Sequence, residues 1–291
     1  MFRPKKYAAR MNKSIYITGA SGFVGINLMQ YFGADYSFNP YNRKVAVEIK
    51  EDVLIHSAGR AHDLKNTTEE AEYYQANTAL TQNVYDAFLA SYAKVFIYLS
   101  AVKAVAEKIE GALTEDTAPN PITPYGKNKL LAEQYIFSKP IPPDKKVHVL
   151  RPCLIHGPGN KGKLNLLFKL VGKGIPLQLS AFENKRLFCI IQILIFTVQE
   201  IIERGDIGGG VYNIADNEAL SSKELISIIG KAIGKRSRSW KLIKFLIKKL
   251  ANLGDVVHLP LNTERLRKLA ESYVVRNNKM TFQFSLDIPV M

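Results

Sequence analysis

The stretch TGASGFVG, residues 18–25, constrains the fold of this chain more than any other segment. It follows a short apolar run at Ile15–Thr18 and precedes apolar residues at helical spacing, which predicts a strand, a tight turn and a helix. Glycines at this spacing let the backbone turn sharply and let a pyrophosphate approach the unpaired N–H groups of the helix start. The context favours a dinucleotide site over a purely structural turn. The expected contacts are Gly19, Ser21, Gly22, Phe23, Val24 and Gly25.

Strands and helices alternate through the first two thirds of the chain. Apolar runs at 52–59, 93–101 and 146–159 predict buried strands, and residues 68–92 and a segment from Pro124 to just before Lys139 predict helices between them. Further expected elements are a strand at 186–191, a helix at 192–204 and a strand at 210–216. This order predicts an α/β fold of the Rossmann type: a doubly wound parallel sheet covered by helices on both faces.

The expected domain division follows the same pattern. We expect residues 1–12 to be a disordered, basic extension, and 13–160 together with 187–215 to form the dinucleotide-binding domain. Residues 161–186 and 216–291 form a small, mostly helical substrate lobe, whose last 75 residues we expect to be helical and basic.

Composition excludes several classes of protein. With 47% hydrophobic and 23% charged residues, the chain is a folded globular protein and not a disordered one. Cys153 and Cys189 each lie in an apolar run, which argues against a disulfide framework and a zinc cluster and fits a reducing, cytoplasmic compartment. The five histidines lack ligand spacing, so no metal is expected. The longest apolar run, Leu187–Val198, is about half the length that spans a bilayer and predicts a buried strand running into a buried helix.

Positive charge is concentrated near the C-terminus. The net charge is +14, and residues 225–254 contain no acid. Within them, 240–254 alternates leucines and lysines at helical spacing, which favours a helix of the small lobe with a solvated lysine face. Docking on a membrane surface is the alternative, which would make a cytoplasmic protein peripheral to the inner membrane face. Nucleic acid is not expected, because no series of stacking aromatic residues accompanies the charge.

The choice between NAD and NADP depends on the end of the second strand. No acidic residue that could bind the adenosine ribose is evident there, and only a short strand fits between the first helix and residue 52. Arg43 lies where a 2′-phosphate would be bound, so NAD and NADP are equally expected cofactors.

Tyr125 and Lys129 are separated by four residues, so on a helix they share one face. Pro124 suits the first turn of that helix. An ammonium and an oxidised nicotinamide near the phenol would both favour the phenolate and make Tyr125 a usable general acid and base. Such a pair alone is more often a surface feature, but its position after a dinucleotide turn and 25 residues after Ser100 favours catalysis.

Together these stretches resemble the extended short-chain dehydrogenase/reductases that act on nucleotide sugars. The match rests on TGASGFVG, LIHSAGRAH, YQANTALTQNV, FIYLSAVKAV, PNPITPYGKNKLLAEQ, LRPCLIHGPG and FENKRLF, in family order over about three quarters of the chain. The chain looks most like the bacterial enzymes of surface-polysaccharide assembly that epimerise or reduce UDP-linked N-acetylated sugars at C4. The resemblance implies an NAD(P)-dependent epimerase/dehydratase-type enzyme and, as is frequent among its relatives, a homodimer.

The resemblance also implies roles for single residues. Tyr125, Lys129 and Ser100 would be catalytic, with Lys129 also binding the nicotinamide ribose. Ala58, Gly59 and Pro152 would line the cofactor, and Asn165 and Arg186 would bind the nucleotide sugar. The chain departs from the family at Ala101, where a second serine is usual, at Leu154 and at His156. These departures keep a rival open: a dinucleotide-binding or membrane-peripheral scaffold protein of the same fold with impaired catalysis.

Overall fold

A six-stranded parallel sheet forms the centre of the molecule. The computed structural model describes residues 13–60, 70–160, 168–169, 171–173, 184–234 and 272–284. Within them the strand order is β2-β1-β3-β4-β6-β9, so the chain reverses direction across the sheet at β1, between β1 and β3. Ligands of doubly wound sheets bind at such a reversal, outside the carboxyl ends of the strands. The strands are β1 (Ser14–Thr18), β2 (Ser37–Pro40), β3 (Val53–His56), β4 (Val95–Leu99), β6 (Lys146–Pro152) and β9 (Gly210–Ile214).

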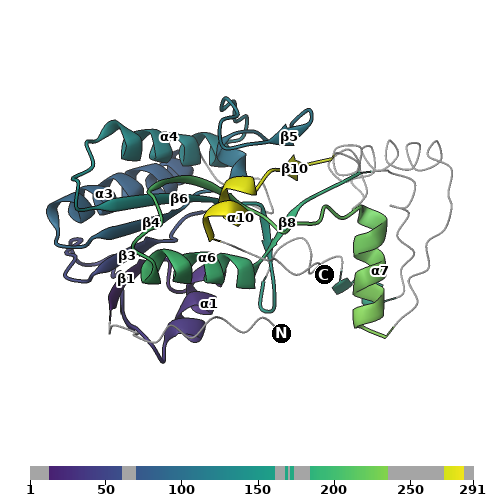
Figure 1. Cartoon of the computed structure of the whole chain (residues 1–291), viewed down its shortest axis with the longest axis horizontal. Helices are drawn as coiled ribbons and strands as arrows, with labels where there is room; N and C mark the ends of the chain where they lie inside the picture. The colour runs from purple at the N-terminus through teal and green to yellow at the C-terminus, as the bar shows by residue number, and fades with distance from the viewer. Residues whose placement is uncertain are drawn as a thin grey trace.

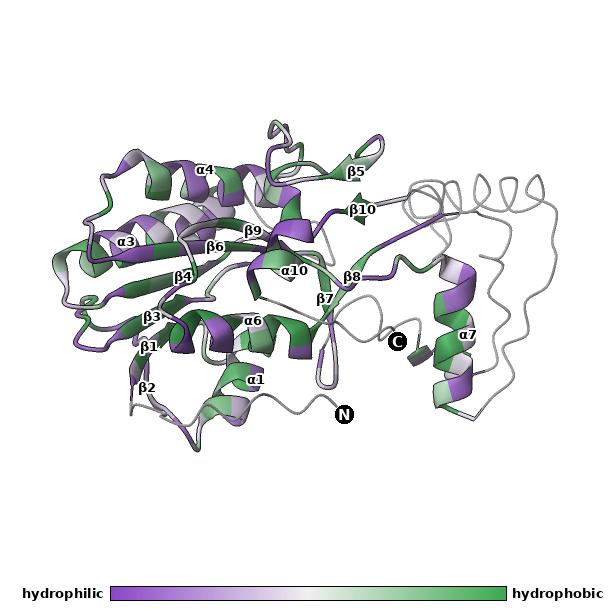
Figure 2. Cartoon of the chain, viewed as in Figure 1, coloured by the Kyte–Doolittle hydropathy of each residue, from purple (hydrophilic) through white to green (hydrophobic). Residues whose placement is uncertain are grey.

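Helices cover both faces of this sheet (Figure 1). Helices α1 (Phe23–Phe32) and α6 (Ile191–Glu203) lie on one face, and α3 (Leu80–Ala90) and α4 (Pro124–Ser138) lie on the other. Alternation along each strand produces the two cores: Ile15 and Ile17 pack toward α1 and α6, whereas Tyr16 packs toward α3 and α4. In Figure 2 the strands carry mostly hydrophobic residues, as expected for a sheet buried on both faces. The predicted fold class is therefore confirmed.

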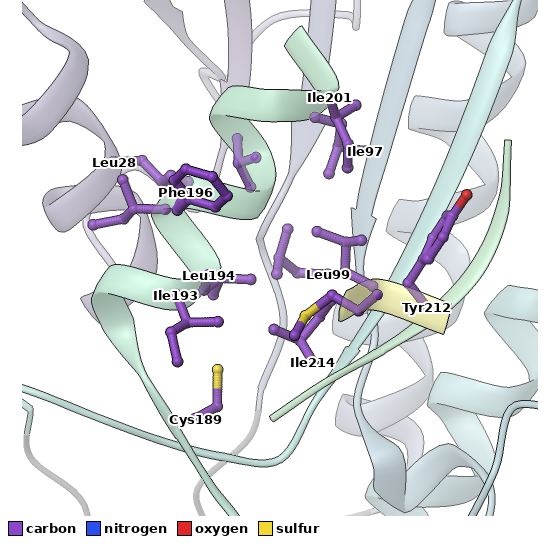
Figure 3. Packing of buried hydrophobic residues seen from close by; sticks show 14 of the residues in the cluster. Leu28, Ile97, Leu99, Cys189, Ile193, Leu194, Phe196, Ile201, Tyr212 and Ile214 are labelled. Carbon is purple, nitrogen blue, oxygen red and sulfur yellow. The ribbon is translucent and has the colours of Figure 1, made fainter. Parts of the chain in front are cut away.

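The core beneath α6 explains the longest apolar run of the sequence. Strand β8 (Phe188–Ile190) runs directly into α6, which has buried side chains all around its axis. Figure 3 shows Phe196 of α6 near Leu28 of α1, and Ile201 of the same helix near Ile97 of the sheet. The prediction of a buried strand leading into a buried helix is confirmed. Among the described residues, no helix is long and apolar enough to cross a membrane.

Two expected elements are interrupted. The prediction of a single strand at 146–159 is wrong. Strand β6 ends at Pro152, and β7 (Leu154–His156) leaves the main sheet to pair with β8. The break comes at Cys153, whose N–H still bonds to Ile214 O. The helix expected at 68–92 consists of α2 (Glu70–Tyr73), a π-helical turn at Tyr74–Ala79, and α3.

The C-terminal part of the chain is not wholly helical, contrary to expectation. Helix α7 (Ser222–Ala232) is followed, within the described residues, by β10 (Val274–Val275) and α10 (Asn278–Phe284). Strand β10 pairs with β5 (Ala112–Leu113), which follows a short 3₁₀ turn at Val102–Ala104. Helix α10 packs against β9 in the core, where the rings of Phe284 and Tyr212 lie 5.5 Å apart. The domain boundaries stay a prediction, as does the lysine-rich helix of 240–254, which lies outside the described residues.

Candidate active site

The glycine turn closes tightly at the carboxyl end of β1. Gly19 has φ +74°, and a Cβ on it would lie 2.6 Å from Ala58 N; a Cβ on Gly25 would lie 2.2 Å from Gly19 O. Both positions exclude a side chain. No side chain in the described part of the chain caps α1, whose N-cap is Gly22. The start of α1 lies at the point where the strand order of the sheet reverses. Its backbone N–H groups and the positive end of the helix dipole are therefore placed to bind a phosphate. These residues fit a dinucleotide.

The loop after β3 forms the facing wall of this crevice. Ser57 Oγ donates to Thr18 O at 2.6 Å, and Ala58 N donates to Thr18 Oγ1 at 3.1 Å, so this loop and the glycine turn lie against each other. A Cβ on Gly59 would lie 2.7 Å from Asn77 Oδ1 and 3.2 Å from Lys129 Nζ. Gly59 therefore lies between the π-helical turn and α4, with no room for a side chain.

Lys129 is buried at the carboxyl end of β4, with 3% of its surface exposed. Its Nζ donates to Leu99 O at 2.7 Å and lies 4.7 Å from the centre of the Tyr98 ring. Burial lowers the pKa of Lys129 to about 8, although Glu133 acts in the opposite direction. A side chain so placed is not the surface partner of an ordinary helical pair.

Tyr125 occupies the first turn of α4, one helical turn before Lys129. Thr123 caps the helix by accepting from Gly126 N, and Pro124 is the first helical residue, as the sequence predicts. Burial, and secondly the nearby Tyr73, raise the pKa of Tyr125 well above its ordinary value. The surrounding protein groups therefore favour the neutral phenol, and the phenolate expected from the sequence would have to come from the charge of an oxidised nicotinamide.

Ser100 follows β4 directly but points into the protein. The side chain is 4% exposed, and its hydroxyl donates to the Glu133 carboxylate on α4. Glu133 also pairs with the buried Arg151, which donates from Nε at 3.0 Å and from Nη2 at 2.5 Å. A hydroxyl in this network has its proton committed to Glu133. This geometry favours a structural role for Ser100, and the catalytic role expected from the sequence stays a prediction.

Ala101 follows in extended backbone, with φ −161° and ψ 152°. Its side chain therefore points to the opposite side from that of Ser100. No hydroxyl stands at that position.

The other expected ligands lie around the same edge or outside the described residues. Pro152 ends β6, and the exposed Arg43 lies just after β2, whose four residues confirm the expected short second strand. The backbone of Arg186 bridges to Leu220 and Tyr273, which connects the segment before β8 to two later parts of the chain. Asn165 lies outside the described residues. In the described ranges no cluster of metal-ligating side chains occurs.

Three buried polar groups at this edge are absent from the sequence-based assignment. Asn77 lies in the π-helical turn, and its amide accepts from Arg60 N at 2.9 Å and donates to Arg60 O at 3.2 Å. Glu133 and His56 lie in runs that read as an amphipathic helix and an apolar strand. The one available signal was the placement of Glu133 four residues after Lys129, which puts both on one face of α4.

Known proteins resemble this chain in sequence over most of its length. The model of the NAD dependent epimerase/dehydratase family matches residues 34–215, well over half of the chain. The chain is 28% identical over 263 residues to a UDP-glucose 4-epimerase of Vibrio cholerae, covering 80% of this chain and 79% of that protein. It is 25% identical to a GDP-6-deoxy-D-mannose reductase of Pseudomonas aeruginosa, covering 75% and 80%.

Solved structures share the fold. A UDP-glucuronic acid 4-epimerase of Bacillus cereus in complex with NAD superposes with a TM-score of 0.71 at 20% identity, covering 96% of this chain and 94% of that one. A dTDP-4-dehydrorhamnose reductase of Bacillus anthracis in complex with NADP gives a TM-score of 0.74 at 18% identity, covering 96% and 95%. The chain therefore belongs to the NAD dependent epimerase/dehydratase family and is an enzyme whose cofactor is NAD or NADP.

Proposed function

We propose that this enzyme acts at C4 of a UDP-linked, N-acetylated sugar, as an epimerase or as a 4-keto reductase. The observation that carries the proposal is the placement of Lys129, buried between Leu99 O and Gly59, one helical turn after Tyr125 and beside the dinucleotide crevice. A cationic residue that lies on the tyrosine's helix and borders the Gly59 wall of the crevice suits proton exchange with a sugar hydroxyl.

The residues act in the following way. The dinucleotide, when bound, supplies the exchange of a hydride with the sugar carbon. Because its pKa is raised, the Tyr125 phenol is neutral and has a proton to donate to a carbonyl oxygen at C4; the resulting phenolate is a base that takes the proton back when the sugar is oxidised. Lys129 would orient the nicotinamide ribose and carry a positive charge one helical turn from Tyr125. The start of α1 would bind the pyrophosphate, and Arg43 would distinguish NADP from NAD.

The relatives support a role in surface-polysaccharide precursor synthesis. One of them, 24% identical over 255 residues and covering 80% of this chain and 76% of its own length, is an N-acetyl-α-D-glucosaminyl-diphospho-ditrans,octacis-undecaprenol 4-epimerase of Escherichia coli O157:H7. We assign Arg186 and Asn165 to the nucleotide sugar, and we expect a homodimer. The relative's lipid-linked substrate supports a cytoplasmic enzyme that contacts the inner membrane face weakly.

A second candidate is a catalytically impaired protein that retains the dinucleotide. The observation in its favour is that the hydroxyl of Ser100 donates to Glu133 while position 101 is alanine. An oxyanion donor is worth roughly 2 to 4 kcal/mol of barrier, so its absence would slow turnover about 30- to 1,000-fold.

The two candidates are separated by a product assay. Purified protein is mixed with UDP-N-acetylglucosamine, and the C4 epimer is followed by proton NMR with and without added NAD⁺; reduction of a UDP-4-keto sugar is followed by loss of NADPH absorbance. Formation of product in either assay supports the enzyme. Binding of NAD⁺ or NADPH with no turnover in both assays would support the impaired protein.

A further inference from the structure

His56, at the end of β3, is fully buried between the end of β1 and helix α3. Its Nδ1 lies 2.6 Å from Thr18 Oγ1, in the strand end that leads into the glycine turn. Its Nε2 lies 2.8 Å from Thr81 Oγ1, on α3 just after the π-helical turn. Both ring nitrogens therefore have a hydroxyl partner, and each hydroxyl belongs to a different layer of the fold.

The surrounding hydrogen bonds fix the direction of both contacts. Thr81 donates its single hydroxyl proton to Asn77 O at 2.7 Å, so its oxygen must accept a proton from His56 Nε2. Nδ1 is then unprotonated and accepts the Thr18 hydroxyl proton. The Thr18 oxygen in turn accepts from Ala58 N at 3.1 Å. The result is one continuous chain of donors from the β3 loop to the π-helical turn.

A charged imidazolium does not fit this site. It would carry two N–H donors, and Thr18 could accept only by giving up its own donation. The His56 ring also stacks on Tyr98 at 5.5 Å and 17°, and the same Tyr98 ring lies 4.7 Å from Lys129 Nζ. Burial, with a smaller contribution from Lys129, lowers the pKa of His56 to about 3. The ring is neutral whenever the protein is folded near neutral pH.

We propose that His56, held as its neutral Nε2–H tautomer, is a positioning residue for the dinucleotide. It fixes Thr18, and through Thr18 the Ala58 amide, so that the glycine turn and the Ala58–Gly59 loop keep the separation that the cofactor requires. The role of His56 depends on the family's dinucleotide site and not on the proposed sugar. It can therefore fail while the sugar assignment holds, and the sugar assignment can fail while the role of His56 holds.

The tautomer is tested on the unmodified protein. Protein labelled with ¹⁵N-histidine is examined by long-range ¹H–¹⁵N NMR, and the His56 signal is identified by its loss in His56→Gln. We expect one protonated Nε2 and one unprotonated Nδ1, unchanged from pH 6 to pH 8. Protonation at Nδ1, or a ring that titrates in this range, would overturn the proposal.

The positioning role is tested by calorimetric titration with NAD⁺ and NADP⁺. His56→Leu removes both hydrogen bonds, while His56→Gln keeps one donor and one acceptor. The matched control is His148→Leu, because His148 is also fully buried but neither of its nitrogens has a hydrogen-bond partner among the described residues. We expect His56→Leu to raise the Kd at least about tenfold, His56→Gln to raise it less than about threefold, and His148→Leu to leave it unchanged.

Equal Kd changes in the two leucine variants would refute a specific role for His56. If His56→Leu does not fold, Thr81→Val gives the same test in milder form, because it removes the acceptor for Nε2–H, together with the donor to Asn77 O, and keeps the imidazole ring. That variant should weaken cofactor binding and mix the two tautomers in the NMR spectrum, and a wild-type spectrum with wild-type affinity would contradict the proposal.

Discussion

Replacing Ser100 by alanine separates a structural role from a catalytic one. The hydroxyl donates to Glu133, whose carboxylate is buried and also accepts from Arg151. We expect Ser100→Ala to lower the free energy of unfolding and to leave turnover unchanged within about threefold, because the lost contact lies inside the protein and not on the substrate.

The magnitude follows from the acceptor. A hydrogen bond to a charged group contributes about 1.5 to 3 kcal/mol. The loss of unfolding free energy in Ser100→Ala should fall at the lower end of this range, because two nitrogens of Arg151 still donate to Glu133 and leave its charge paired. A catalytic hydroxyl would behave differently: its removal would lower kcat roughly 30- to 1,000-fold with little change in stability.

The assays are urea denaturation and steady-state kinetics on the same preparations. Ala101→Ser is the companion variant, since residue 101 points to the opposite side from Ser100 and lacks a hydroxyl. We expect it to raise kcat at least about tenfold. Wild-type stability of Ser100→Ala, together with a kcat lowered at least about 30-fold, would refute the structural role of Ser100.

Three further predictions follow. Lys129→Met should abolish turnover yet raise the free energy of unfolding at pH 7 by about 1 to 3 kcal/mol, because it removes a buried charge. In the folded wild type the pKa of Lys129 is about 8, below its ordinary value of 10.5, so the free energy of unfolding of the wild type rises as the pH increases from 8 to 10.5. The difference in unfolding free energy between Lys129→Met and the wild type, measured by urea denaturation, should therefore shrink over this range. Lys145→Met should lower the free energy of unfolding by about 2 kcal/mol, measured by thermal unfolding. The reason is that Lys145 Nζ donates to three carbonyls at the end of α3, those of Phe88, Ser91 and Ala93. A change near zero would show that water replaces the ammonium group. Gly19→Ala should lower the affinity for NAD⁺ at least about tenfold, because residue 19 has φ +74° and a Cβ there would clash with Ala58 N. An unchanged Kd in calorimetric titration would contradict the importance of the tight turn for cofactor binding.

Local signals in the sequence were sufficient for the sheet and for the placement of Tyr125 and Lys129 on one helix. The glycine spacing after β1 and the apolar runs of β3, β4 and α6 each depend on residues close together in the chain. The four-residue spacing of Tyr125 and Lys129 likewise places both on one face of α4 without any knowledge of the rest.

Features that depend on distant partners could not be predicted in this way. Strand β7 leaves the main sheet to pair with β8, whose partner residues lie 34 positions later in the chain. The Ser100 side chain is oriented by Glu133, and His56 by hydroxyls of β1 and α3, and none of these pairings produces a periodic pattern. The pKa of Tyr125 differs from expectation for the same reason, since burial depends on the whole fold.

We have proposed that Tyr125 exchanges a proton with a sugar at C4 in a site built around NAD or NADP. This role is tested by Tyr125→Phe, with C4 epimerisation of UDP-N-acetylglucosamine or reduction of its 4-keto form measured beside calorimetric titration of the cofactor. We expect a rate at least about 10²-fold lower with an unchanged cofactor Kd. Turnover equal to that of the wild type, at the same cofactor affinity, would contradict it.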